Sequence, residues 1–474
     1  MAHDEGGFGH WLASNVIGFN PFQGLHPTED HGFLEWIGEW GVSRGMTVGI
    51  LFFGLYSILS MQVPNLPLFT LEWVVGTVPL WLPPALFVGM VRSYINYARS
   101  DFLSKRKPVL LEIKIPREID KSPRAMELVL ANLYVNAGQT TVLDRAWLGT
   151  MRPWFSFEVC SFGGEIHFYA WCWGTYRRLV ETSIYSQYPE VEIVEAEDYA
   201  SKFVYDPEVH MGFCGDYLYF GRSPKWPGDE YPIKSYVDFE LDKDPKEEFR
   251  VDPLAGMFET LGSLKPHEQI WIQINFRCAI NNGIFYGGHS GSAWTERVKK
   301  AVEDIRVEAS TFSKDTHLSE EELRSARPRG TWRHTEMLMA MERHLGKQPF
   351  EVGMRHIYLS SGEFHGPTYT AVRWIWRALN SPNYFNYIRS RRGHNPWDYP
   401  WQDFKNYRWH LTTRRYIDMI RRRSFFHTPW ETPAQVMSTE MIATLYHYPS
   451  SSVKSPGIQR IAAVKSEPPP NLPR

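Results

Sequence analysis

Arginines and aromatic residues alternate densely between residues 373 and 423, and this is the segment best equipped for chemistry. Its only acidic residues are Asp398, Asp403 and Asp418. Arginine binds phosphate through paired hydrogen bonds, and aromatic rings stack on nucleobases. The arginines that we expect to make contacts are Arg389, Arg391, Arg392, Arg414, Arg415, Arg421, Arg422 and Arg423. The interleaved rings are Trp374, Trp376, Tyr384, Phe385, Tyr387, Trp397, Tyr399, Trp401, Trp409 and Tyr416.

This composition leaves several partners open. Nucleic acid fits the arginines and rings, and anionic lipid headgroups fit the arginines if the segment lies near a membrane. The alternatives are an acidic patch on a neighbouring subunit and an ordinary solvated face. The formal net charge of the whole chain is −2, which excludes a globally basic nucleic-acid binder.

No spacing typical of a catalytic or metal site occurs in the sequence. The chain lacks the GxxxxGK[ST], HExxH and GxGxxG patterns. Gly288-His289-Ser290-Gly291 comes nearest to a nucleophile elbow, but Ser292 stands where the second glycine is required. The four cysteines form no CxxC pair, which gives no support to a zinc or redox site. We therefore expect no enzymatic activity, cofactor or metal.

Two apolar runs near the N-terminus determine where the remaining elements lie. Met46–Met61 and Val74–Val91 contain no charged residue, and each is close to the roughly 20 residues needed to span a bilayer. We predict a transmembrane hairpin over 45–97, although a re-entrant hairpin and a pair of buried core helices are alternatives. Three prolines should kink the second helix: Pro79, Pro83 and Pro84.

The charges that flank these runs predict an orientation. The linker Gln62–Glu72 has no lysine or arginine, whereas Arg92, Arg99, Lys105, Arg106 and Lys107 follow the second run. This asymmetry is the positive-inside pattern, and it predicts a cytoplasmic (inner) membrane protein whose soluble domains face the cytoplasm. The segment 1–44 is amphipathic, so its rings lie either at the membrane interface or on protein. The residues expected at the interface are Trp11, Trp36, Trp40, Lys105, Arg106 and Lys107.

The soluble sequence is typical of an α+β protein. A strand over 109–115, a helix opened by Ser122-Pro123 and a strand pair joined at Gly163-Gly164 begin a β-α-β-β-α-β order, the ferredoxin-like motif. We predict tandem ferredoxin-like domains, the second being an expanded unit that starts with a strand over 233–241. The predicted parts are 105–200 (first domain), 201–230 (linker), 231–380 (second α+β domain), 381–454 (Arg/aromatic-rich region) and 455–474 (proline-rich tail).

Several stretches resemble a known family. LLEIKIPREIDKSPRAMELVLANL, WFSFEVCSFGGEIHFYAW, YRRLVETSIYSQYPEVEIVEAEDY, STEMIATLYHYP and the tail SPGIQRIAAVKSEPPPNLPR are similar to an uncharacterised membrane-protein family of candidate-phyla (Patescibacteria-type) bacteria. Those proteins resemble the N-terminal region of conjugative, type IV secretion-like ATPases. The resemblance covers 109–199 and 437–474 well and the middle loosely, and it supplies no catalytic residues. It implies a freestanding membrane-proximal part that serves a separate P-loop ATPase.

These observations predict a non-enzymatic scaffold of an oligomeric membrane machine, and the expected setting is secretion or DNA transfer. Its expected partners are the lipid bilayer, further copies of itself and a separate motor. The alternative is a membrane-tethered nucleic-acid receptor that uses residues 373–423.

Overall fold

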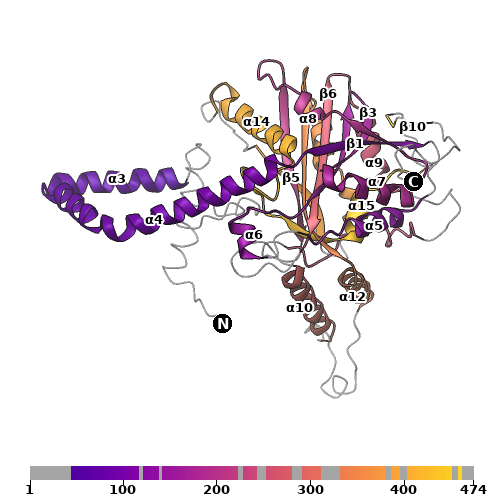
Figure 1. Cartoon of the computed structure of the whole chain (residues 1–474), viewed down its shortest axis with the longest axis horizontal. Coiled ribbons are helices and arrows are strands. Elements are labelled where there is room, and N and C mark those ends of the chain that lie inside the picture. Colours follow the sequence, from indigo (N-terminus) through magenta and orange to yellow (C-terminus); the bar gives the residue numbers. More distant parts are fainter. Residues whose placement is uncertain are drawn as a thin grey trace, which may run out of the picture. The chain divides into compact units, whose positions relative to one another are not determined.

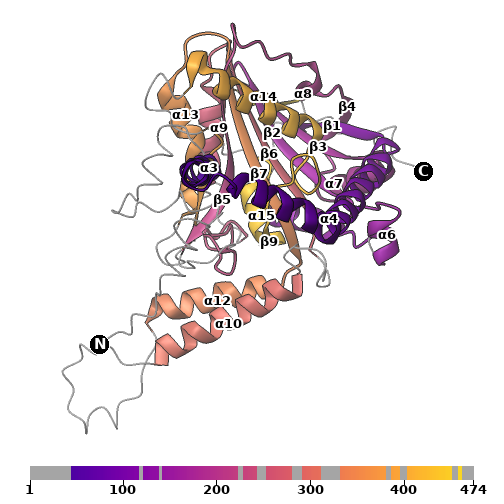
Figure 2. The same ribbon diagram turned by 90° about the vertical axis from the view of Figure 1, so that its left-hand side faces the viewer.

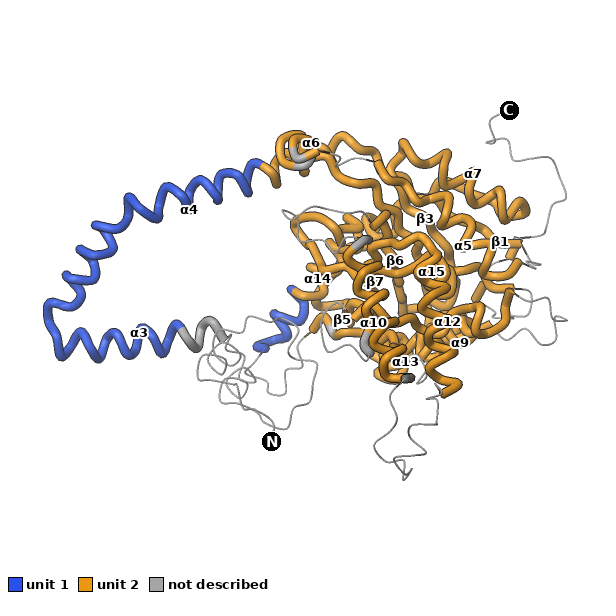
Figure 3. The backbone as a smooth tube through the Cα atoms, turned by 90° about the horizontal axis from the view of Figure 1, so that it is seen from below, with its two compact units in different colours: residues 1–94, 395–411 blue, residues 95–394, 412–474 orange. Residues whose placement is uncertain are grey.

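The computed structural model describes residues 44–116, 121–137, 141–221, 228–242, 252–279, 291–310, 331–380, 386–394, 403–450, 457–458 and 460–461 (Figure 1). The chain forms two compact units (Figure 3). One contains residues 1–94 and 395–411, and the other contains residues 95–394 and 412–474. The expected interface residues Trp11, Trp36 and Trp40 lie outside the described residues.

Two helices contain the apolar runs of the sequence. Helix α3 spans Arg44–Gln62, and helix α4 spans Leu66–Ser104 and continues into the second unit. The hydroxyls of Tyr56 and Thr70 lie 2.7 Å apart and connect the two helices. Among the described residues, α4 is the one helix long and apolar enough to cross a bilayer, since the apolar part of α3 is shorter.

The turn between these helices is tighter than the predicted linker Gln62–Glu72. Helix α4 already begins at Leu66, because Pro67 falls in its first turn, where a missing backbone donor costs no hydrogen bond. The helix also continues through Pro79, Pro83 and Pro84 without a break.

The second unit is built on one large sheet that is antiparallel throughout its main body. Its order is β10-β1-β3-β2-β6-β7-β5-β8, with β4 also paired to β1 and β9 to β7. Among the strands that the structure describes, the short β10 pairs in parallel with its neighbour β1. The strands are β1 Pro108–Pro116, β2 Phe155–Phe162, β3 Glu165–Trp173, β4 Glu192–Ala196, β5 Met211–Gly221, β6 Glu268–Cys278, β7 Pro349–Ser360, β8 Asn386–Arg392, β9 Gln435–Ser438 and β10 Arg460–Ile461.

The two halves of this sheet have matching strand orders. The N-terminal half has the order β4-β1-β3-β2, and the C-terminal half has the order β8-β5-β7-β6. Strands β2 and β6 join the halves through a continuous register from Phe155–Phe276 to Phe162–Gln269. The parts 105–200 and 231–380 therefore share one sheet.

Helices cover both faces of the sheet (Figure 1). One face packs on α5, α7, α9, α13 and α15, and the other packs on α8 and α14. Helices α10 and α12 lie side by side and form a smaller core of their own (Figure 2). Their bounds are α5 Pro123–Asn132, α6 Val142–Ala146, α7 Arg177–Gln187, α8 Tyr199–Lys202, α9 Ala255–Gly262, α10 Gly291–Ser310, α12 Trp332–Leu345, α13 Gly366–Arg373, α14 Tyr407–Arg422 and α15 Thr439–Leu445.

Strand β5 lies within 201–230, the segment that we expected to be a linker. Glycine-rich sequence is typical of loops, but the glycines of β5 lie where neighbouring chain segments pack closely against the strand. A Cβ atom at Gly212 would collide with the side chain of Thr413, and one at Gly215 would collide with the backbone of Arg391. Conversely, residues 233–241 form no strand as we expected: residues 233–235 are irregular and residues 236–241 form turns.

Much of the described part of 381–454 also belongs to this second unit, which we call the body: residues 386–394 and 412–450 lie in it, whereas residues 403–411 belong to the first unit. Strands β8 and β9 belong to the sheet, and helix α15 is wholly buried. The described residues of this arginine- and aromatic-rich region in the body are therefore folded, and some of them contribute to its core.

Candidate functional site

A row of polar side chains crosses the sheet face that α8 and α14 cover. Strand registers place each member opposite the next on seven successive strands. A single register of this kind puts all the members on the same face of the sheet. The members are Glu112, Tyr169, Glu158, Gln273, Arg355, Asp216 and Arg391, and we call them the polar row.

Arg423 is inserted into the middle of the polar row. Its guanidinium is fully buried and donates to both carboxylate oxygens of Glu158, at 3.0 and 3.1 Å. It also donates to both oxygens of Asp198, at 2.6 and 2.9 Å. Ser156, Tyr199 and Gln273 also donate hydrogen bonds to Glu158. Two bidentate pairs fix this side chain in one geometry.

The electrostatics of this cluster favour its charged form. Burial by itself raises the pKa of Asp198, but the charge and hydrogen bonds of Arg423 outweigh burial and hold this pKa below its usual value. Burial alone would lower the pKa of Arg423, whereas Glu158 and the other anionic partners raise it well above the ordinary value. We predicted that Arg423 contacts an external partner; in the structure its guanidinium is buried and paired with Glu158 and Asp198 of its own chain.

Asp216 lies between two arginines in the other half of the polar row. Arg355 faces it from β7, with 3.8 Å between Nε and Oδ1, and Arg391 faces it from β8. The hydroxyl of Tyr416 on α14 donates to Asp216 at 3.0 Å. Burial raises the pKa of this carboxyl, and Arg355 opposes the shift most strongly. Arg391, which is half-buried, thus faces a charged partner of its own sheet.

The exposed arginines gather on the outer face of α14. Arg414, Arg415, Arg421 and Arg422 are exposed there, whereas the residues between them, such as Ile417, are buried. Helical periodicity produces this separation, and we call these four residues the arginine face.

Partners within the protein already hold part of the arginine face. Arg415 stacks on Trp430 at 4.7 Å, and Arg422 pairs with Asp418 at 2.8 Å. Arg421 donates to the carbonyls of Ala200 and Phe203, at 3.2 Å each.

The remaining predicted contact residues are dispersed. Arg389 on β8 stacks near Trp374 at 5.6 Å, and the side chain of Arg392 lies outside the described residues. Two of the rings proposed to stack on bases, Trp376 and Tyr416, are buried in the cores. The rings outside the described residues are Tyr384, Phe385, Trp397, Tyr399 and Trp401.

The predicted basic residues after the apolar run lie at the end of α4 and just beyond it. Lys105 and Lys107 are exposed, and Lys105 pairs with Asp101 at 2.7 Å. Arg106 stacks on Phe102 at 4.6 Å and on Trp173 at 5.5 Å. Arg106 therefore packs against the body, while the two lysines face solvent.

One cysteine–histidine pair needs to be weighed as a catalytic dyad. Cys214 Sγ lies 3.4 Å from His394 Nδ1, which is within hydrogen-bonding reach. Both residues are buried, and burial raises the pKa of the Cys214 thiol well above its ordinary value. A nucleophilic cysteine requires a lowered pKa and access for substrate, so we assign this pair to the core.

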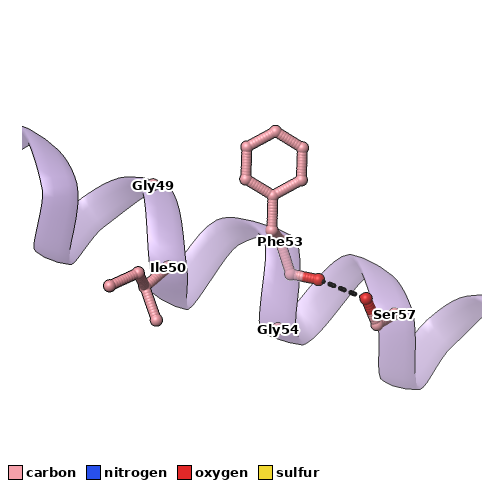
Figure 4. Close-up of a pocket in the computed structure, with 5 residues that line it drawn as sticks. All are labelled: Gly49, Ile50, Phe53, Gly54 and Ser57. Carbon is pink, nitrogen blue, oxygen red and sulfur yellow. Dashed lines mark hydrogen bonds between the residues drawn. The ribbon is translucent and has the colours of Figure 1, made fainter.

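Two hollows among the described residues are poor candidates for a substrate site, one because its lining is mostly apolar and the other because it is small. One hollow lies along α3 and is lined by Gly49, Ile50, Phe53, Gly54 and Ser57, whose hydroxyl donates to the carbonyl of Phe53 (Figure 4). A second hollow, near Asp252 and His447, holds about 20 Å³, which is room for roughly one water. Among the described residues, no three His, Cys, Asp or Glu side chains converge to hold a metal.

The polar row was missed at the level of sequence. Its signal is a charged or amide residue in the middle of an apolar strand, as in Phe157-Glu158-Val159 and Ile272-Gln273-Ile274. Strand pairing across many intervening residues is needed before these residues form a row. Comparison of the chain with models of known protein families gives no match, and neither does comparison with curated proteins.

Proposed function

We propose that this chain is a membrane-anchored, non-enzymatic scaffold within an oligomeric membrane machine, in a setting like secretion or DNA transfer. The exposure of α3 and α4 carries the proposal. Phe53 is 67% exposed and Leu80 is 79% exposed, so these helices do not form a soluble core. An apolar surface of this extent is stable in lipid and unfavourable in water.

The two helices form the anchor as a transmembrane hairpin. Their turn faces the outside, and the body faces the cytoplasm, where the basic residues after Val91 favour it. The matching strand orders of the two sheet halves support tandem ferredoxin-like units that share one sheet. Such a body offers long surfaces for subunit contacts, and closed symmetry is the usual outcome when one chain contacts its own copies.

Cysteine labelling tests the hairpin and its orientation. All four native cysteines are buried, so an introduced thiol reacts against a low background. Asn65→Cys in the turn should react with an impermeant maleimide on intact cells, and Lys107→Cys should react only after permeabilisation. Reaction of both thiols on intact cells, or of neither, contradicts the hairpin.

The mass of the complex, extracted gently from its native membrane, tests the scaffold. We expect a homo-oligomer that co-purifies with a P-loop ATPase. A monomer without partner chains would overturn the proposal.

The arginine face favours nucleic-acid binding as a second candidate function. Its affinity would fall steeply with salt, because bound phosphates release counterions. Replacement of Arg414 and Arg415 by glutamine should weaken binding and reduce the salt dependence, whereas Lys347→Gln, on the other side of the sheet near Glu127, should not. Binding that is absent or independent of salt removes this candidate.

A further inference from the structure

Helix α6 and the two residues that follow it display large apolar side chains; we call residues 142–148 the α6 segment. Leu143 is 69% exposed, Trp147 is 65% exposed and Leu148 is 58% exposed. A capping box closes the start of the helix, in which Thr141 and Asp144 exchange hydrogen bonds of 3.0 and 3.1 Å. The three apolar side chains are therefore held in place at the surface.

The segment after α6 is fixed against α4. Gly149 adopts a φ of 62° and lies so close to the backbone of Ala98 and Arg99 that a Cβ atom would collide with it. Only glycine combines this conformation with this approach. Thr150 also donates backbone and side-chain hydrogen bonds to the carbonyl of Asp144, both at 2.8 Å. Figure 3 shows α6 beside the C-terminal end of α4.

The point of attachment lies just beyond the outer limit of the headgroup layer of a bilayer that α4 would span, within reach of that layer for long side chains. Ala98 follows Val91, the end of the uncharged run, by seven residues, which is about 10 Å along a helix. The headgroup layer extends about 5–8 Å beyond the hydrocarbon core. Tyr97 is exposed immediately before the contact, and exposed tyrosine is typical of this level.

The charges at this end of α4 favour anionic lipid. Arg92, Lys105 and Lys107 are exposed. The nearby acidic residues are Asp101, which pairs with Lys105, and Asp144, which closes the capping box. The net positive charge of the C-terminal part of α4 and the residues just after it complements anionic headgroups.

We propose that the α6 segment is an interfacial anchor that inserts Leu143, Trp147 and Leu148 into the anionic headgroup layer of the membrane that α4 would span. This inference rests on the proposed membrane anchoring. Short segments with tryptophan and leucine on one side and basic residues nearby bind such interfaces. The anchor would hold the body at a set distance from the bilayer, so the orientation of the scaffold would not depend on one helix alone.

Spin labels on single introduced cysteines test this inference in the full-length protein. The protein is reconstituted in vesicles of phosphatidylcholine and phosphatidylglycerol, and each label is exposed to oxygen and to a water-soluble nickel reagent. Leu148→Cys reports on the α6 segment, and Phe87→Cys reports on α4. Met339→Cys on α12 is the exposed control, because α12 lies far from α6 in Figures 1 and 2.

We expect the labels at Phe87 and Leu148 to be reached by oxygen and shielded from nickel, and the label at Met339 to be open to nickel. The double variant Leu143→Ser/Trp147→Ser should open the label at Leu148 to nickel without changing the far-UV circular dichroism. A label at Leu148 that is as open to nickel as that at Met339, or shielded from both reagents by protein, overturns the anchor. A label at Phe87 outside lipid overturns the membrane proposal itself.

Discussion

At the scale of single residues, Arg423 shows that an arginine in an arginine-rich segment can stabilise the fold and need not bind an external partner. It neighbours Arg421 and Arg422 in sequence, yet only Arg423 is withdrawn from water and bonded to Glu158 and Asp198. A buried charge without a partner is costly, so each member of this cluster depends on the others.

Replacement of Arg423 by methionine should lower the free energy of unfolding by about 3–5 kcal/mol, because Glu158 is left buried without its counter-charge. The same change at Arg422, which pairs with Asp418 at the surface, should cost less than about 1 kcal/mol. Urea unfolding measures both. Equal losses of stability in the two variants would mean that Arg423 is solvated. In a double variant, adding Glu158→Gln to the Arg423 replacement should restore part of the lost stability, because no buried carboxylate is then left unpaired.

Buried histidines make stability depend on pH. Burial lowers the pKa of His344 and His356 to about 3 each and that of His427 to about 4. The unfolded chain binds these protons near pH 6.5, so stability is fully present above that pH and falls as the solution becomes more acidic. At pH 5 the loss for His356 is on the order of 2 kcal/mol. Asp216 and Glu440, whose pKa values burial raises, oppose this trend.

The histidine contribution is isolated by comparing urea unfolding of the wild type and His356→Gln at pH 7.5 and pH 5. The wild type should lose more stability on acidification than the variant. An identical loss in both proteins would show that His356 is protonated in the folded state.

At the scale of elements, the segment after α14 closes the polar face of the sheet. The ring of Phe425 occupies the space above Gly353 on β7, where a side chain would stand in most strands. Arg355 stacks on the same ring at 4.8 Å. The glycine therefore allows an aromatic cover to lie directly on the strand.

Gly353→Ala should destabilise the protein by about 1–3 kcal/mol, because its methyl group forces Phe425 away from the sheet. Gly256→Ala in α9 is the matched control. Its methyl group enters open space, and alanine favours the helix by up to about 1 kcal/mol. Thermal unfolding of both variants gives the comparison, and a harmless Gly353→Ala would mean that Phe425 does not rest on β7.

At the scale of the whole molecule, the continuous sheet makes the two halves of the body one cooperative structure. Strands β2 and β6 hydrogen-bond along their shared length, and one apolar core contains residues from both halves. Neither half can expose its edge strand without breaking this pairing.

Unfolding of the body should therefore be a single transition. Val129→Ala in α5 and Val372→Ala in α13 each remove buried methyl groups, one from each half. Both changes should shift the same transition, by about 1–3 kcal/mol, whether it is followed by tryptophan fluorescence or by far-UV circular dichroism. Two transitions, each moved by only one of the variants, would indicate independent domains.

Local features of the body were predictable where neighbouring residues decide the structure. Helix α5 begins at Pro123 after its N-cap Ser122, and the turn between β2 and β3 uses Gly163 and Gly164, with φ of 59° and 95°. Strand β5 was not predictable in this way, because its glycines match contacts from α14 and β8 that are distant in sequence.

The sequence by itself determined the apolar runs, the strand–turn–strand unit at Gly163-Gly164 and the absence of familiar catalytic spacings. These depend on residue type and on spacing within about one turn or one strand. Only the tertiary structure decided that Arg423 is interior, that seven polar residues align across the sheet and that α6 is held beside α4. The physical reason is that burial and register depend on contacts between residues far apart in the chain, which no local pattern records.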